Sequence, residues 1–175
     1  MSIIRELRYE DGHPVQSPVR ELEQFRSAPQ TASLFAPDQA LSLSLSQAEE
    51  ILMHVDAKSA AQLSLFFFDT QNEFLQMDLF PAQGILRLDQ SKCGYSTALK
   101  PNADGRLEAP FRLIDNAVDL RVYLDACSFE VFVNGGEQVL STRVFPKHAG
   151  TGFRVQTNGD CDVQVTAFAL TVDKS

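Results

Sequence analysis

Short segments in which apolar and polar residues alternate, separated by turn residues, run through most of the sequence. Leu41, Leu43 and Leu45, for example, alternate with serines. A period of two places every second side chain on one face of an extended strand, so each segment predicts a half-buried β-strand. The predicted strands are residues 41–45, 51–55, 63–68, 74–80, 85–89, 107–112, 119–125, 128–134, 139–145, 153–157 and 163–172. This succession predicts an all-β fold, a two-sheet antiparallel β-sandwich of the jelly-roll or concanavalin-like kind.

Turn residues stand where such strands must reverse direction. Gly, Pro, Asn and Asp are concentrated at residues 69–72, 81–84, 101–105, 135–136 and 158–160. Two further segments carry helix signals. Ser17 followed by Pro18 is compatible with a helix start, and helix and extended chain both stay open there. Residues 46–49 resemble a capping box, but the alternation that follows favours a strand from Glu50.

One hairpin can be paired residue by residue. A two-residue loop at Ala126 and Cys127 would join residues 119–125 to residues 128–134. The partners on one face are then all apolar: Leu124 with Phe129, Val122 with Val131 and Leu120 with Val133. Those on the other face are Asp125 with Ser128, Tyr123 with Glu130 and Arg121 with Phe132. Because a slip of one residue would exchange the two faces, the unbroken apolar set favours this register.

A further loop at Gly135 and Gly136 extends the pairing and places Phe132 opposite Val139, on the face away from the core. Large apolar side chains there have two interpretations. A loop or the aliphatic stem of Arg121 shields Phe132, or this face contacts another protein surface, either a partner domain or a second copy of the chain.

Charge and composition exclude several classes of partner. The 175 residues include 15 Lys and Arg against 23 Asp and Glu, a net charge of −8 without a basic run, so nucleic acid and membrane surfaces are not expected partners. No segment has the pattern of a signal peptide or a membrane helix. The three cysteines are an odd number without Cys-x-x-Cys spacing, which is typical of a reducing compartment, and we expect a cytoplasmic protein of one domain.

The sequence predicts no metal site and no cofactor. His13, His54 and His148 lie far apart, and no paired cysteines accompany them. Glycine motifs that cradle phosphates or present a nucleophilic serine do not occur. Cys127 and Cys161 have no neighbouring cation that would stabilise a thiolate.

Asp125 and Glu130 are the most plausible pair of carboxylates for a glycosidase, because both lie on the outer face of the hairpin. The simpler interpretation is that Asp125 caps the amides of its turn and that Glu130 is exposed and pairs with Tyr123 or with a cation.

The hairpin sequence resembles a known family. Residues 120–137 (LRVYLDACSFEVFVNGGE) and 142–146 (TRVFP) are similar to the C-terminal β-sandwich of glycoside hydrolase family 32, the invertase, sucrose-6-phosphate hydrolase, inulinase and levanase group. Residues 5–7 (REL) with 16–22 (QSPVREL) resemble the segment that connects the family's catalytic propeller to its sandwich. Residues 86–91 (LRLDQS) resemble an internal strand of the same domain.

The resemblance implies a domain organisation, with residues 1–26 as a linker-like segment and residues 27–175 as the sandwich. Family members catalyse on the preceding propeller, using Asp and Glu in Trp-Met-Asn-Asp-Pro-Asn-type, Arg-Asp-Pro and Glu-Cys motifs. The present sequence has no Trp, no Asp-Pro and no Glu-Cys, so no catalytic residue is assigned.

The resemblance therefore implies a non-catalytic module of a β-fructofuranosidase. Its expected partner is a family 32 propeller in cis or in trans, and a homodimer is possible. Its roles would be domain packing, stability and oligomer contacts. The candidate interface residues, expected to self-associate when the propeller is missing, are Leu7, Leu22, Phe132 and Val139. The alternative is a lectin-like module for fructan or sucrose, with Arg121, Tyr123 and Glu130 as candidate contacts.

Overall fold

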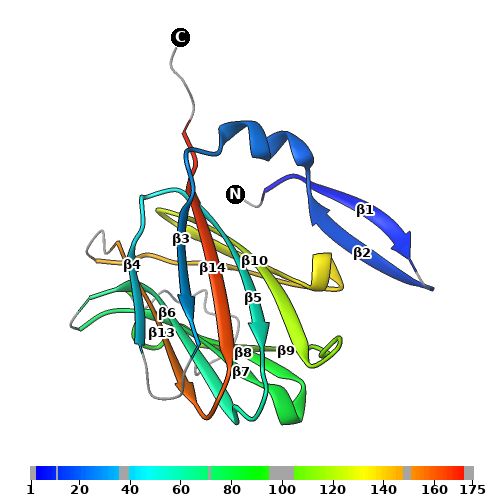
Figure 1. The fold of residues 1–175 in the computed structure, drawn as a ribbon. Coiled ribbons are helices and arrows are strands. Elements are labelled where there is room, and N and C mark those ends of the chain that lie inside the picture. Colours follow the sequence, from blue (N-terminus) through cyan, green and yellow to red (C-terminus); the bar gives the residue numbers. More distant parts are fainter. Residues whose placement is uncertain are drawn as a thin grey trace.

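The chain, described by a computed structural model, folds into two antiparallel β-sheets that pack face to face, with a separate hairpin formed by its N-terminal residues (Figure 1). The structure describes residues 3–10, 12–35, 40–70, 72–94, 105–147 and 151–171. The predicted two-sheet antiparallel sandwich is confirmed.

Within the described ranges, each sheet contains six strands. Those of the first sheet are β3 (Gln30–Leu34), β5 (Glu49–Asp56), β10 (Ala117–Asp125), β11 (Ser128–Val133), β12 (Gln138–Arg143) and β14 (Asp162–Ala169), in the order β12-β11-β10-β5-β14-β3. Those of the second sheet are β4 (Ala40–Ser44), β6 (Gln62–Asp69), β7 (Leu75–Phe80), β8 (Ile85–Asp89), β9 (Arg106–Pro110) and β13 (Gly152–Asn158), in the order β4-β13-β6-β7-β8-β9. A short 3-10 turn, η2 (Pro81–Gln83), joins β7 to β8.

Every predicted strand corresponds to a strand of one of these sheets, and the prediction for residues 85–89 matches β8 at both ends. The sequence did not predict β3. Only Leu34 of that strand is buried, so its polar neighbours gave no alternating pattern. The predicted turn at residues 101–105 lies, apart from Gly105, outside the described residues.

The predicted hairpin register is confirmed for all six pairs between β10 and β11, from Leu120 with Val133 to Asp125 with Ser128. The expected pairing of Phe132 with Val139 is also present. The connection after β11 is longer than predicted, because it passes through the 3-10 turn η3 (Asn134–Gly136) and the paired residues resume at Gln138.

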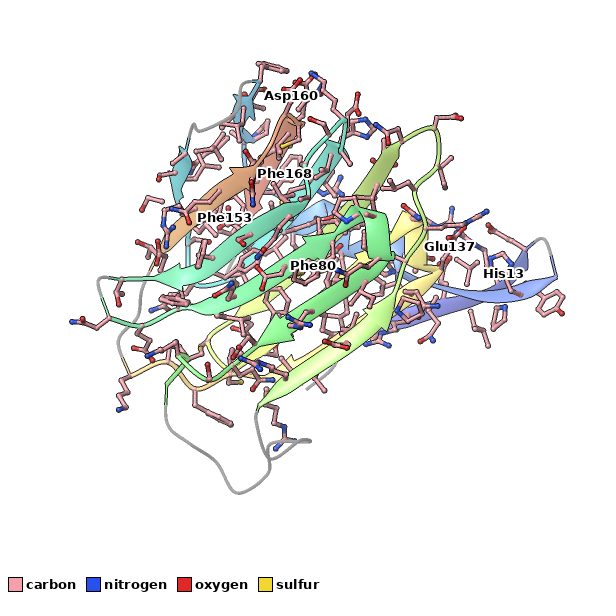
Figure 2. All side chains as sticks on the ribbon, turned by 90° about the horizontal axis from the view of Figure 1, so that it is seen from below. His13, Phe80, Glu137, Phe153, Asp160 and Phe168 are labelled. Atoms are coloured by element: carbon pink, nitrogen blue, oxygen red, sulfur yellow. The ribbon has the colours of Figure 1, made fainter. Side chains whose placement is uncertain are left out.

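The core lies between the two sheets and is built from the inward side chains of both. Phe67 of β6 packs edge-on against Phe129 of β11, with 4.8 Å between the ring centroids. It also contacts Phe153 of β13, which is labelled in Figure 2, at 5.1 Å. These three side chains are at most 1% exposed. Such contacts tie the sheets together by aromatic packing as well as by burial of apolar area.

A bulge explains the apolar run at the end of β6. The pairing of β6 with β13 shifts between Gly152 and Phe153, and Phe68 adopts a left-handed backbone conformation (φ 55°). The extra residue interrupts the alternation, so the neighbouring Phe67 and Phe68 are both buried in the core. Phe66 points to the outer face, where the Arg154 guanidinium lies 3.9 Å from its ring centroid.

The N-terminal residues form a hairpin of β1 (Arg5–Glu10) and β2 (His13–Pro18), which we call the arm. The arm is a sheet of its own and projects beyond the sandwich (Figures 1 and 2). A 3-10 helix, η1 (Arg20–Phe25), connects it to β3. The helix starts later than the Ser17 signal suggested, since Val19 occupies its N-cap and makes no side-chain capping bond.

The second helix signal also has a structural explanation. Both the backbone N–H and the hydroxyl of Ser46 donate hydrogen bonds to Oε2 of Glu49, at 2.8 and 2.5 Å. The residues of the capping box therefore bond to each other, but the chain continues as strand β5 from Glu49, close to the predicted start at Glu50.

Candidate functional site

The charged and aromatic residues singled out in the sequence gather on the outer face of the first sheet. β5, β10 and β11 place Glu50, Tyr123 and Glu130 on the side opposite the core, and all three are buried. Burial on an outer face requires a cover. Part of that cover is the N-terminal segment, which contacts this face through Arg5 and Arg26.

Glu50 is the centre of the first charged cluster, with a side chain that is 0% exposed. The Arg26 guanidinium donates two hydrogen bonds to its carboxylate, from Nε at 2.7 Å and from Nη2 at 2.8 Å. Arg121 donates a third bond from Nε at 2.6 Å, and the Tyr123 hydroxyl donates a fourth at 2.9 Å. A buried carboxylate costs several kcal/mol unless it is paired in this way, so the cluster depends on all its members.

The cluster changes the protonation of its groups. Burial acts to raise the pKa of Glu50, but the hydrogen bonds and positive charges around it outweigh burial, and the pKa lies below the ordinary 4.5. Burial, followed by the charge of Glu50, raises the pKa of Tyr123. The hydrogen bond to Glu50 raises the pKa of Arg26. The carboxylate therefore stays ionised at neutral pH and the phenol stays neutral.

Glu130 is the centre of the second cluster and is 2% exposed. Arg5 donates a hydrogen bond from Nη2 to Oε2 at 2.5 Å, and the backbone N–H of Ile3 donates to Oε1 at 2.7 Å. The Ser141 hydroxyl on β12 donates to Oε2 at 3.2 Å. The Arg5 guanidinium also lies over the ring of Phe132, 5.4 Å from its centroid.

The expectation that Phe132 belongs to an exposed apolar strip is wrong, because Phe132 is 1% exposed. The other interpretation, that Phe132 is shielded, is confirmed, although Arg121 is not the residue that covers it. Arg5 lies over its ring and Tyr123 packs edge-on against it at 6.1 Å, whereas Arg121 lies over Tyr123. A Phe132→Arg variant would therefore report on folding and not on an interface.

The remaining interface and sugar-contact candidates differ in how far their side chains are exposed. Among the interface candidates, Leu7 is 72% exposed on the arm, while Leu22 and Val139 are half-buried. Among the sugar-contact candidates, Tyr123 and Glu130 are buried and occupied by internal partners, so they do not combine with Arg121 into one open site.

Asp125 and Glu130 do not form an acid–base pair. Asp125 is exposed at the end of β10 and accepts a hydrogen bond from the Ala126 backbone N–H at 2.6 Å, as the simpler interpretation predicted. Glu130 does pair with a cation, Arg5, but it is buried instead of exposed and its phenol neighbour bonds to Glu50.

A shallow groove of about 400 Å³ lies across β5, β10 and β14 on the same outer face. Its polar lining includes Arg121, Gln164 and Thr166, together with His54 and Asp119, whose Nδ1 and Oδ1 atoms are 2.7 Å apart. These groups can hydrogen-bond a polar ligand.

Within the ranges that the structure describes, no three His, Cys, Asp or Glu side chains are grouped to hold a metal ion. The thiol of Cys161 is buried, and burial raises its pKa, which disfavours the nucleophilic thiolate. In the same ranges, no helix has the length and apolar character to cross a membrane.

Sequence reasoning did not single out Glu50, Arg26 and Arg5. One signal was available for Glu50, because this acidic residue directly precedes the apolar residues of a predicted strand. In the structure that strand, β5, lies in the middle of the first sheet. Nothing in the local sequence identifies its partners, because Arg26 is 24 positions away and Arg121 is 71 positions away.

Together these features define a class of domain: an antiparallel β-sandwich in which two buried carboxylates of the outer face, those of Glu50 and Glu130, are bonded by arginines, two of them from the N-terminal segment. The family model for the C-terminal domain of glycosyl hydrolases family 32 matches residues 21–172. The chain therefore belongs to glycoside hydrolase family 32, as the C-terminal domain.

Individual relatives agree with this assignment. The probable sucrose-6-phosphate hydrolase of Vibrio cholerae is 30% identical over 87% of this chain and 25% of its own length. The exo-inulinase of Aspergillus awamori has a similar fold (TM-score 0.78, 17% identity, 95% of this chain and 34% of that one). So has the β-fructofuranosidase of Schwanniomyces occidentalis (TM-score 0.76, 11% identity, 98% and 40%). The chain spans about a quarter of the length of the curated Vibrio relative.

Proposed function

We propose that this chain is the non-catalytic sandwich module of a β-fructofuranosidase that acts on sucrose, sucrose 6-phosphate or fructan. The module packs against the catalytic propeller, in cis or in trans, and stabilises it. Support for the parent activity comes from the family match over residues 21–172 and from relatives described as sucrose-6-phosphate hydrolases.

The observation that carries the non-catalytic assignment is that the two buried carboxylates of the outer face, Glu50 and Glu130, are bonded by arginines. Retaining and inverting glycosidases place two carboxyl groups roughly 5–9 Å apart across the scissile bond, one as acid and one as base or nucleophile. Glu50 and Glu130 are instead held by arginines and are at most 2% exposed. A carboxylate held in this way can neither donate a proton to the glycosidic oxygen nor attack the anomeric carbon.

The experiment compares the purified chain with a hybrid enzyme. In the hybrid, this chain replaces the corresponding C-terminal quarter of the Vibrio cholerae relative. We expect no hydrolysis of sucrose, sucrose 6-phosphate or levan by the chain alone, and hydrolysis of sucrose 6-phosphate by the hybrid. Hydrolysis by the chain alone would contradict the assignment, and so would an inactive hybrid.

We do not propose the alternative, a fructan-binding module built on Tyr123 and Glu130, because both side chains are buried and engaged inside the chain. Sugar-binding platforms present exposed aromatic faces, and Tyr123 is 4% exposed.

A further inference from the structure

The groove across β5, β10 and β14 is built from two rows of outward side chains. The strand pairing places three side chains next to one another in each row: Gln164, His54 and Asp119 in the first, and Thr166, Leu52 and Arg121 in the second. Neighbouring strands lie about 4.8 Å apart and alternate residues about 7 Å apart, so the two rows cover about 10 by 7 Å. This area suits a small ligand, such as one or two sugar rings.

The groove is open to solvent, whereas the next row along the same strands is covered. That row holds Phe168, Glu50 and Tyr123, of which the last two are at most 4% exposed. In the groove, the side chains of His54 and Asp119 are 50% and 70% exposed. The arm and η1 lie toward one end of β5 and β14 (Figure 1). The groove therefore begins where the cover of the outer face ends, and a ligand can reach it.

The charged groups of the groove are paired within the protein. Nδ1 of His54 lies 2.7 Å from Oδ1 of Asp119. Because an ionised carboxylate only accepts hydrogen bonds, Nδ1 carries the proton in this contact, and Nε2 of the neutral ring is left as an acceptor. Arg121 donates to Glu50 from Nε at 2.6 Å. With these charges balanced and a net charge of −8 on the chain, the groove favours a neutral ligand over an anion.

Hydrogen-bonding groups surround an aliphatic floor. The Gln164 amide and the Thr166 hydroxyl can each donate and accept, and Asp119 adds acceptor oxygens. Leu52 is half-buried in the middle of the second row. The volume of about 400 Å³ lies within the roughly 300–1,000 Å³ of small-molecule sites, which combine apolar surface with a few polar groups. A saccharide presents the complementary chemistry, because its hydroxyls donate and accept and its ring faces carry C–H groups.

We propose that this groove binds a neutral saccharide of one or two rings. A ring face packs on Leu52, and hydroxyls bond to Gln164, Thr166 and Asp119. Of the sugar contacts predicted from the sequence, only Arg121 lines the groove. This binding goes beyond the proposed packing function and needs no second domain. Fructans and α-glucans share the required chemistry, and the test distinguishes them.

The test is an amide chemical-shift titration of the isotope-labelled chain. The separate probes are a levan disaccharide, maltose and inorganic phosphate. We expect saturable shifts with at least one of the two sugars at the amides of β5, β10 and β14 that line the groove, and no shifts there with phosphate.

A double variant and a matched control locate the site. Asp119→Ala with Gln164→Ala should weaken sugar binding about tenfold or more, because it removes hydrogen-bonding groups that face the ligand. The control, Glu108→Ala with Gln156→Ala, removes an acid and an amide from exposed positions of the second sheet and should leave the affinity unchanged. All four side chains are exposed, so both variants should unfold at nearly the urea concentration of the unmodified chain.

The outcomes are distinct. Binding of the levan disaccharide alone supports the site and assigns it to fructans, and binding of maltose alone supports it and assigns it to α-glucans. Shifts with neither sugar, shifts that map to another surface, or equal affinity in the double variant and the control overturn the inference. Phosphate that shifts the same amides would make the groove an anion site and overturn it too. An inactive hybrid enzyme overturns the proposed function without touching this result, because the titration uses the chain alone.

Discussion

The Arg5 guanidinium donates a hydrogen bond to the buried carboxylate of Glu130, although 125 positions separate the two residues in the sequence. This contact fastens the start of the arm to β11 of the first sheet. The arm therefore belongs structurally to the sandwich at its base, even though its far end projects from it.

Arg5→Ala should release the arm. The Glu130 carboxylate would keep its bonds from Ile3 and Ser141 but would lose its charged partner, at a cost of about 2 kcal/mol in the free energy of unfolding. Hydrogen exchange of the β2 amides should accelerate. Arg8→Ala is the control, since Arg8 pairs with Glu10 on the exposed surface and should change stability by less than about 0.5 kcal/mol. Equal exchange in the two variants would contradict the role of the anchor.

Glu50→Gln should destabilise the chain more strongly. The substitution keeps the shape of the side chain but leaves Arg26 and Arg121 without the charge they surround, and we expect a loss of about 3 kcal/mol in urea unfolding. Glu108→Gln serves as the control, because Glu108 of β9 is 49% exposed and pairs with Arg87 on the surface. If both variants lost the same small amount of unfolding free energy, the result would contradict a stabilising role of the Glu50 cluster.

Stability should fall at acid pH. The folded-state pKa of Glu50 is lower than its unfolded value near 4.5, so its contribution is complete above that value and is lost as the pH falls through the lower one. Glu137, whose pKa is lowered by the hydrogen bond from Arg112, adds in the same direction. Urea midpoints between pH 3 and 7 should decrease toward acid, with a shallower decrease in Glu50→Gln. An identical slope in that variant would contradict the assignment.

Stability should also fall at alkaline pH, for the opposite reason. Burial raises the pKa of Tyr123 above its ordinary 10.0, so above pH 10 the unfolded chain releases this proton while the folded chain keeps it. The unfolded state is then favoured as the pH rises. Urea midpoints from pH 9 to 11 should decrease in the wild type and decrease less in Tyr123→Phe.

The two neighbouring glycines of η3 should respond differently to alanine. Gly136 (φ 110°) has the Gln16 carbonyl oxygen where a Cβ would lie, so Gly136→Ala must push β2 away from the sandwich. Gly135 (φ 71°) has open space there, and Gly135→Ala should cost only the left-handed backbone strain of about 1 kcal/mol. Hydrogen exchange of β2 amides should increase in the first variant only; an increase in both would place the effect in the turn itself.

Much of the sandwich could be predicted because its information is local. In β10 and β11, apolar side chains on one face and polar ones on the other fix the register, since a slip of one residue would turn Val122 and Val131 out of the core. The arm was different. In β1, Arg5, Leu7 and Tyr9 lie on one face and charged residues lie on the other. Because neither face is buried in the core, the sequence has no apolar face that would mark β1 as a strand.

The sequence by itself determined the all-β class, the positions of most strands along the chain, the pairing of the central hairpin and the family resemblance, because each depends on neighbouring residues or on a contiguous motif. Only the tertiary structure decided that Phe132 is covered, that Glu50 and Glu130 are held by arginines, and that the arm extends past the sandwich. The bonds between the arginines and the two carboxylates join residues that are between 24 and 125 positions apart. No local periodicity encodes which arginine reaches a buried carboxylate, since that depends on how the N-terminal segment crosses the finished sheet.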